Sequence, residues 1–504
     1  MVKEEKEYFS HVKNFADDEI RLIFHTVEYF FSKKLKLYSR MLKNENSKVA
    51  ILLFLVIALP VLAGAQKMMN KLSAAMTVFQ ADSQLQNADI SLCILNNKDG
   101  KILYQKNKNQ LLPPASTIKT FTTASALHYL GKNFVYTTKI NFKGIILTDT
   151  AYGELIVYAS GDPSFGSDRF DETKPLPIFT KIETGLRQLN IKYWKGNIRV
   201  VNNIFTDSSS SKYWMDEDYG NYYGAGVFGL NWKENKFDLQ IAPLGNEFVV
   251  KNNDGGLDNE KDFCLVLQQK NEASTEDAFA YVIKDSICKY AIRGYLSGVK
   301  GLQTLSLARL HPDEDFKKDV MAYLKTKFKV EEANLELAAD EINIAAIESP
   351  PLSKLIYACN QKSLNLYAES FCKTIAYQNT HQGMWLLGIA EMKKFAKKLG
   401  VDEQAIQLLD ASGLAPNNKI NTYTLAKLLS LYKRQNWAST FVESLPLINN
   451  ITMKSGYIGG TRSYAGYMVL PNGTPISFAF IVHHFAGSPK TVKEKMFKLL
   501  DTLK

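Results

Sequence analysis

A serine and a lysine three positions apart, Ser116 and Lys119, are the residues in this sequence best placed for covalent chemistry. They follow Pro113-Pro114-Ala115 and open an apolar stretch, 117–130, that is expected to be helical. Side chains at this spacing share one helix face. A serine hydroxyl needs a neighbouring base to act as a nucleophile, and a lysine can be that base when burial or nearby positive charge lowers its pKa. The spacing predicts a serine acyl-transfer site.

The spacing alone is not specific, because a Ser-x-x-Lys pair is more often a solvated surface pair than a catalytic one. It occurs at seven serines: 10, 116, 209, 286, 297, 370 and 430. Two further motifs lie downstream of Ser116 in the order that a catalytic site needs. This context favours Ser116 over the other six.

The first of these motifs is Ser363-Leu364-Asn365, at the expected start of a helix. Serine and asparagine favour the N-cap position, so a capping role is the simpler interpretation. The alternative is a hydroxyl that shuttles a proton and an amide that holds a substrate carbonyl and the base lysine.

The second motif is Lys454-Ser455-Gly456, followed by Tyr457, on an expected strand. A lysine on a strand is usually solvated. Here Gly456 would allow a substrate backbone to lie close against the strand. Lys454 would then bring positive charge to the site and to a substrate carboxylate.

Elements from both ends of the chain are expected to position these motifs. Strands at 90–95 and 101–104 precede Ser116, and strands at 452–457, 466–470 and 476–483 lie near the other end. Helices are expected at 352–360, 366–377, 384–399, 422–432 and 492–503. This order predicts an α/β (α+β) fold with one sheet assembled from both ends. Between the catalytic segments 66–135 and 346–504, the block 136–345 is rich in short strands and has one expected helix, 315–328, so it reads as an insertion.

Composition and cysteine spacing exclude several classes of protein. Apolar residues make up 46 % of the chain, which is ordinary for a globular protein. The net charge of +10 is spread thinly, so a nucleic-acid partner is not expected. The five cysteines form no Cys-x-x-Cys pair, which argues against zinc and thioredoxin-like sites. In an oxidising compartment Cys264 and Cys288 could pair across neighbouring strands.

An uncharged segment at 49–65, VAILLFLVIALPVLAGA, follows Lys43 and Lys48 and ends in Ala-Gly-Ala. A positive flank, a short apolar core and small residues at the end describe a secretory signal peptide. The polar lead 1–48 is unusually long for one. Either translation starts later, at Met41, or 1–48 is a cytoplasmic tail on a signal anchor. Both alternatives place the rest of the chain outside the cytoplasm, in the periplasm or anchored to the inner membrane facing it.

Taken in order, the three motifs resemble those of the penicillin-recognising serine enzymes. The 247 positions between Ser116 and Ser363 are too many for a plain β-lactamase. The chain resembles more closely the D-alanyl-D-alanine carboxypeptidase/endopeptidases of the penicillin-binding-protein-4 type, the low-molecular-mass class C penicillin-binding proteins. The stretches that carry this resemblance are PASTIK at 114–119, GDPSFG at 161–166, ESPPLSKLI at 348–356, KSLNLYAES at 362–370, DASGL at 410–414 and KSGYIGGT at 454–461.

The resemblance implies a β-lactamase/transpeptidase-like catalytic domain and an acyl-enzyme mechanism without metal or organic cofactor. Ser116 would attack the carbonyl of a D-Ala-D-X bond in peptidoglycan, and Lys119 would take its proton. Ser363 would relay a proton to the leaving amine, and Asn365 would orient the acyl chain. Lys454 and Ser455 would support the substrate carboxylate. The backbone N–H groups of Ser116 and Tyr457 would form the oxyanion hole, and β-lactams would inhibit.

Two departures from the family pattern affect substrate preference more than reaction class. Leu364 replaces the usual Asp, and the usual Lys-Thr-Gly-Thr/Ser becomes Lys454-Ser455-Gly456-Tyr457. Asp162 matches an inserted acidic residue that recognises a peptide amino group in the family, although it is equally explained as a turn residue. Two other functions stay open: a non-catalytic wall-binding or penicillin-sensing protein, and, less favoured, a β-lactamase.

Overall fold

The computed structural model describes residues 68–504 except 260, 271–277, 283–287 and 336–338. The chain divides into two units, Met1–Leu72 and Ser73–Lys504, and the sheets of the described residues all lie in the second. The polar lead 1–48 and the expected export signal at 49–65 fall outside the described residues. Within those residues, no helix combines the length and the apolar character needed to cross a membrane.

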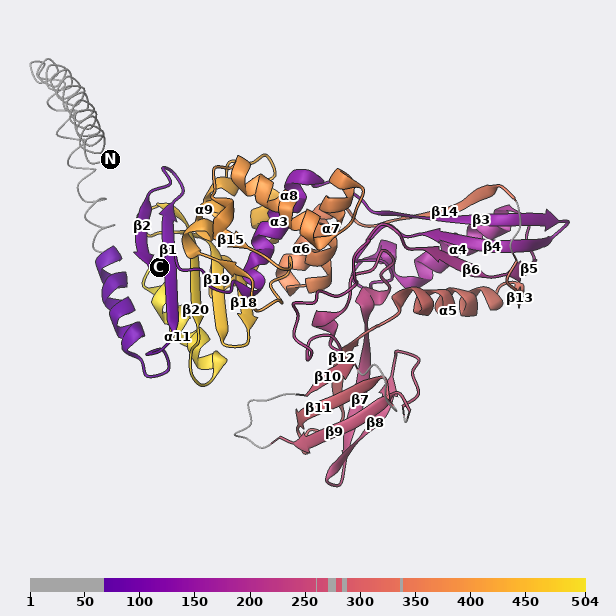
Figure 1. Ribbon diagram of the computed structural model, residues 1–504, viewed down its shortest axis with the longest axis horizontal. Helices are drawn as coiled ribbons and strands as arrows, with labels where there is room; N and C mark the ends of the chain where they lie inside the picture. Colours follow the sequence, from indigo (N-terminus) through magenta and orange to yellow (C-terminus); the bar gives the residue numbers. More distant parts are fainter. Residues whose placement is uncertain (1–67, 260, 271–277, 283–287, 336–338) are drawn as a thin grey trace, which may run out of the picture. The chain divides into compact units, whose positions relative to one another are not determined.

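A six-stranded antiparallel sheet joins the two ends of the second unit, as the sequence predicted (Figure 1). The central pair, β1 (Asp89–Asn96) and β20 (Pro475–His483), is in register over eight residues and almost wholly buried. The other strands are β2 (Ile102–Lys106), β19 (Thr461–Val469), β18 (Ile451–Ile458) and β17 (Leu447–Ile448), in the order β17-β18-β19-β20-β1-β2. The buried runs of β1 and β20 show that both sheet faces are covered.

Alternate residues of the sheet face different helices, because successive strand side chains point to opposite sides. Ser477 of β20 donates to the backbone of α9 (Thr422–Tyr432). Phe480, three residues on, packs against Phe79 from the helix before β1. Tyr464 of β19 lies opposite Phe480 and packs against Phe497 of α11 (Pro489–Asp501). The sheet is therefore a middle layer.

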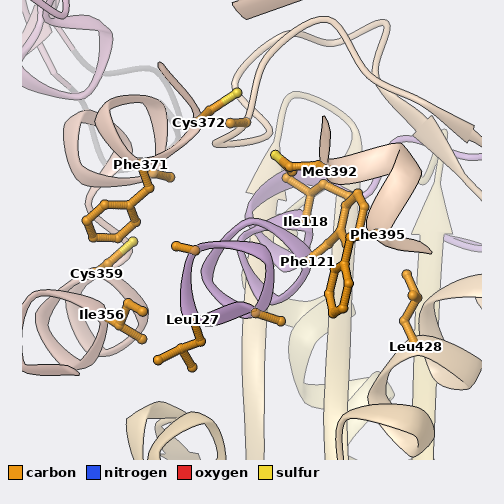
Figure 2. Packing of buried hydrophobic residues seen from close by; sticks show 14 of the residues in the cluster. Ile118, Phe121, Leu127, Ile356, Cys359, Phe371, Cys372, Met392, Phe395 and Leu428 are labelled. Carbon is orange, nitrogen blue, oxygen red and sulfur yellow. The ribbon is translucent and has the colours of Figure 1, made fainter. Parts of the chain in front are cut away.

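Helix α3 (Lys119–Tyr129) runs through the main hydrophobic core, with nine of its eleven residues buried. Figure 2 shows α3 flanked by Ile356, Cys359 and Phe371 on one side and by Met392, Phe395 and Leu428 on the other, all from four neighbouring helices of the same core. These helices are α6 (Leu352–Lys362), α7 (Asn365–Thr380), α8 (Trp385–Lys398) and α9. Packing on all sides fixes the helix that carries Lys119, and this layered α/β arrangement confirms the predicted fold class.

The segment between α3 and α6 forms sheets of its own. One sheet has the order β13-β5-β4-β3-β14, with β6 paired to β4, and its helices are α4 (Pro175–Gln188) and α5 (Pro312–Lys325). Two three-stranded sheets, β12-β7-β8 and β10-β11-β9, share a second small core. The strands are β3 (Thr137–Leu147), β4 (Thr150–Tyr158), β5 (Tyr193–Gly196), β6 (Ile198–Val201), β7 (Lys236–Leu244), β8 (Glu247–Asn253), β9 (Phe263–Gln269), β10 (Phe279–Val282), β11 (Tyr290–Leu296), β12 (Gln303–Ala308), β13 (Lys329–Glu332) and β14 (Glu341–Glu348). The exact domain boundaries stay a prediction.

A disulfide joins Cys264 of β9 to Cys288, two residues before β11, so the predicted cysteine pairing is confirmed. Strands β9 and β11 are parallel neighbours. Cys93, Cys359 and Cys372 are buried thiols.

Candidate active site

Ser116 lies in a tight 3-10 turn, Ala115–Ile118, that leads directly into α3. The expected helix over 117–130 therefore begins with a different geometry, and the residue before the serine is strained. Ala115 has a φ of 47°, a region that non-glycine residues rarely adopt. The backbone of Gly413 lies close against this turn, since a Cβ on Gly413 would lie 2.0 Å from the Ala115 carbonyl oxygen. Contacts from a distant loop thus hold the serine in place.

Lys119 Nζ makes three hydrogen bonds, to Ser116 Oγ at 2.9 Å, Asn365 Oδ1 at 2.6 Å and the Ser412 carbonyl at 2.7 Å. The side chain is fully buried, with 0 % exposure. Burial lowers the pKa of Lys119 to about 8, against the opposing effect of Cys359, Glu369 and Asp410. A substantial fraction of this amine is neutral near physiological pH, and it touches the serine hydroxyl. This is the geometry of a nucleophile and its base.

The Ser363-Leu364-Asn365 motif joins two helices back to back. Ser363 ends α6 in a left-handed conformation with a φ of 56°, and α7 begins at Asn365. No side chain caps α7, so the simpler N-cap interpretation of Ser363 is wrong. Its hydroxyl instead accepts a hydrogen bond of 2.9 Å from Lys454 Nζ. Because of this sharp turn, Ser363 contacts Lys454 and Asn365 contacts Lys119.

Lys454 is buried on β18 with 1 % exposure, so it is not the solvated strand lysine of the simpler interpretation. Its ammonium also donates to the Ser455 carbonyl at 2.9 Å. Burial, followed by the nearby charge of Lys119, lowers the pKa of Lys454 to about 7. Two buried lysines thus lie close enough for the charge of one to disfavour the charge of the other.

Gly456 lets β18 approach the Ser116 turn. A Cβ at this position would lie 2.9 Å from the Ser116 backbone nitrogen and 2.8 Å from the Pro114 carbonyl oxygen. The sequence analysis assigned this space to a substrate backbone, but the protein's own turn at Pro114–Ser116 occupies the direction of the missing Cβ. Ser463, opposite Gly456 on β19, ties the same turn to the sheet by a 2.6 Å hydrogen bond to Pro114.

Tyr457 follows Gly456 on β18, so its backbone lies beside the Ser116 turn. Its side chain is 51 % exposed and lies under the Arg462 guanidinium, which is 4.2 Å from the ring centre. The ring does not fill the core. Because successive strand side chains point to opposite faces, the ring lies on the other face of β18 from the side that Gly456 turns to Ser116.

Asp162 is only 2 % exposed and accepts two hydrogen bonds from Ser164 in its own turn, at 2.8 and 2.6 Å. Burial raises its pKa to about 6. Both hydrogen bonds end on Oδ1, and they are the contacts that a turn residue makes. The recognition role of Asp162 stays a prediction with no contact to support it.

Comparison with known proteins agrees with this geometry. The family model described as D-Ala-D-Ala carboxypeptidase 3 (S13) matches residues 72–503. The chain belongs to the S13 family. Membership makes it a serine-type D-Ala-D-Ala carboxypeptidase and confirms the resemblance found from the motifs.

Individual relatives of this S13 enzyme are distant in sequence but similar over most of their length. It is 21 % identical over 449 residues to the D-alanyl-D-alanine carboxypeptidase of Actinomadura sp. (strain R39), covering 82 % of this chain and 81 % of the relative. It is 20 % identical over 439 residues to the carboxypeptidase DacB of Haemophilus influenzae, covering 82 % and 89 %. The crystal structure of penicillin binding protein 4 (dacB) from H. influenzae superposes with a TM-score of 0.67 at 20 % identity, covering 83 % of this chain and 97 % of that one. A second crystal structure of that protein, complexed with a β-lactam, gives 0.66 at 19 % identity over 86 % and 99 %.

The sequence analysis missed the groups that support the S13 site through hydrogen bonds to Asn365 and to the loop 410–413. The Tyr223 carbonyl, from the inserted segment, accepts a 2.7 Å hydrogen bond from Asn365 Nδ2. Asp410 accepts from the Gly413 backbone at 2.8 Å and from Trp214 Nε1 at 2.9 Å. Glu369 accepts from the backbone of the same loop. Glu369 and Asp410 lie in two of the stretches that carry the family resemblance, KSLNLYAES and DASGL. An acidic residue inside such a stretch was the signal that could have identified them. Tyr223 acts through its backbone, which leaves no residue signature.

Proposed function

We propose that this S13 enzyme hydrolyses D-Ala-D-X bonds of peptidoglycan stem peptides through an acyl-enzyme on Ser116. The observation that carries the proposal is the 2.9 Å hydrogen bond between Ser116 Oγ and the fully buried amine of Lys119. Neutral Lys119 accepts the hydroxyl proton while Ser116 Oγ attacks the D-alanine carbonyl carbon. The tetrahedral oxyanion faces the backbone N–H groups of Ser116 and Tyr457, a role that the close approach of β18 supports.

The second lysine and the Ser363 hydroxyl serve the leaving group. Ser363 Oγ accepts from Lys454, so its own proton is free to pass to the departing amine, and protonated Lys454 replaces that proton. The C–N bond then breaks and water attacks the ester. The proton of the attacking water passes through Ser363 to Lys454, and Lys119 returns its proton to Ser116 Oγ as the ester bond breaks, which restores all three groups. Lys454 and Ser455 face the terminal carboxylate, and Asn365 orients the acyl chain. This sequence balances with water as the only co-reactant.

The same chemistry serves two substrates. With a free D-Ala-D-Ala end it is a carboxypeptidase reaction, and with a cross-linked stem it is a D,D-endopeptidase reaction. A β-lactam presents a similar acyl group and a carboxylate, so it is expected to acylate Ser116. The β-lactam complex of the H. influenzae relative supports this expectation.

Export is part of the proposal, because peptidoglycan lies outside the cytoplasm. The apolar segment 49–65 after two lysines supports it. The Cys264–Cys288 disulfide also supports it, since disulfides persist in oxidising compartments. We place residues 66–504 in the periplasm, either free or held by the N-terminal segment.

The test compares release of D-alanine from a pentapeptide by residues 66–504 and by Ser116→Ala. Wild-type release that disappears in the variant, with an unchanged circular dichroism spectrum, supports the assignment. Retained release in Ser116→Ala would refute Ser116 as the nucleophile. No release by the wild type, together with binding of the peptide, would favour the non-catalytic wall-binding alternative. Cross-linked muropeptides in the same assay separate the endopeptidase from the carboxypeptidase reaction.

A further inference from the structure

Glu369 is a fully buried carboxylate on α7, one helical turn after Asn365. Its oxygens accept hydrogen bonds from three N–H groups: Ala411 backbone at 3.0 Å, Ser412 backbone at 2.8 Å and Trp385 Nε1 at 2.7 Å. Two of these donors lie in the loop whose Ser412 carbonyl accepts from Lys119. Glu369 therefore touches the base lysine only through this loop.

The acceptors around Lys119 decide where its lone pair points. A neutral lysine amine has two N–H groups and one lone pair. Asn365 Oδ1 and the Ser412 carbonyl can only accept, so together they take both N–H groups of the neutral amine. The lone pair is left for the third neighbour, Ser116 Oγ. Without the Ser412 carbonyl in place, an N–H could turn to Ser116 and the base would face away from the proton.

We propose that Glu369 is a positioning residue for the general base: by holding the backbone N–H groups of Ala411 and Ser412, it aims the Ser412 carbonyl at Lys119 and thereby aims the Lys119 lone pair at Ser116. The inference rests on the proposed role of Lys119. It assigns a function to a charge that the reaction itself does not use. Asn365 and Glu369, on one face of α7, then orient the amine together, one directly and one through the loop.

The charge of Glu369 gives this role a signature in the pH profile. Ionised Glu369 favours protonated Lys119 and raises its pKa, against the larger effect of burial. Removing the charge therefore lowers the Lys119 pKa and moves the acidic limb of acylation to lower pH. Burial itself raises the pKa of Glu369 to about 7, followed by the effect of Asp410. Four other titratable groups interact electrostatically with Lys119 or Glu369: Cys359, Cys372, Lys373 and Lys454.

The experiment measures the second-order rate of acylation by a fluorescent penicillin against pH, in residues 66–504. Glu369→Gln removes the charge and turns an amide toward Trp385 Nε1–H; Glu369→Asp keeps the charge but withdraws it by one methylene. We expect both variants to acylate about 10-fold or more slowly, because small misplacements of a catalytic group have large effects. The acidic limb should move to lower pH in Glu369→Gln and stay in place in Glu369→Asp. Adding Trp385→Phe to Glu369→Gln removes the opposing N–H and should recover part of the rate.

The matched control is Glu234→Gln. Glu234 is also a buried carboxylate that contacts α7, through a 2.9 Å hydrogen bond from Tyr367, but it has no hydrogen bond to the Ser412 loop. Its acylation profile should match wild type. Wild-type rate and limb in Glu369→Gln would overturn the proposal, and so would equal losses in Glu369→Gln and Glu234→Gln. If Glu369→Gln does not fold, the rate and limb of Glu369→Asp decide. Acylation that survives in Ser116→Ala, by contrast, would refute the proposed function itself.

Discussion

Replacing Gly456 by alanine tests whether β18 sets the position of the nucleophile. The new Cβ would lie 2.9 Å from the Ser116 nitrogen and 2.8 Å from the Pro114 oxygen, whereas ordinary contacts begin at 3.4 Å. The differences are 0.5 and 0.6 Å, and both atoms are backbone of one turn. The Ser463 side chain, 2.3 Å from the Cβ, would have to rotate as well and lose its hydrogen bond to Pro114.

The expected result follows from that displacement. A misplacement of about 1 Å reduces catalysis by about 100-fold, so a shift of about 0.5 Å should reduce acylation by roughly 10-fold. Overpacking at a buried site should also lower the free energy of unfolding by about 1–3 kcal/mol. Stopped-flow fluorescence with a labelled penicillin measures the first effect, and denaturant titration measures the second.

Gly459→Ala is the matched control, since Gly459 has ordinary φ and no atom within 4 Å of its Cβ position. It should acylate like wild type. A Gly456→Ala protein that acylates as fast as Gly459→Ala would show that the close approach of β18 does not position Ser116.

Three further predictions concern the base, the proton relay and the disulfide. Because burial lowers the pKa of Lys119 to about 8 and the neutral amine accepts the proton, acylation should rise with pH up to about 8 and then level off; a rate that is independent of pH would argue against Lys119 as the base. Ser363→Ala should reduce D-alanine release about 100- to 10,000-fold, because it removes the relay hydroxyl and the acceptor of Lys454, and steady-state release that is unaffected would exclude the relay. The double variant Cys264→Ser/Cys288→Ser should lose about 3 kcal/mol of unfolding free energy, since it opens a loop of 24 residues, and an unchanged urea midpoint would contradict this.

The catalytic sheet was predictable from the sequence because its strands carry strong local signals. The run 90–95 and the turn after it gave β1 and β2, and the alternation near the other end gave β18 to β20. Helix α4 was missed for a local reason. A second proline, Pro177, follows Pro175 in its first turn and Gly185 lies in its interior, and both residues break a helical pattern in the sequence. Proline is tolerated in the first turn, and Gly185 makes room for the β14 backbone, since a Cβ would lie 2.1 Å from the Ile344 oxygen.

The part of the site that is built from side chains in sequence motifs was predictable. Ser116 and Lys119 come together as their spacing suggested, and Ser363, Asn365 and Lys454 join them as the family resemblance implied. The N-cap interpretation of Ser363 was wrong, because its contact with Lys454 and a left-handed turn override the local preference for an N-cap. The supporting contacts could not be read from sequence. Tyr223 is 142 positions from Asn365 and contributes only a backbone oxygen, which any residue type could supply.

The most direct test of the central claim is to map the adduct of a β-lactam on the protein. Residues 66–504 are treated with penicillin, digested and analysed by mass spectrometry, beside Ser116→Ala and Ser209→Ala, a variant at another Ser-x-x-Lys serine. We predict one adduct on the peptide that contains Ser116, absent from Ser116→Ala and unchanged in Ser209→Ala. An adduct that persists in Ser116→Ala, or that maps to another serine, would contradict the assignment of Ser116 and Lys119 as nucleophile and base.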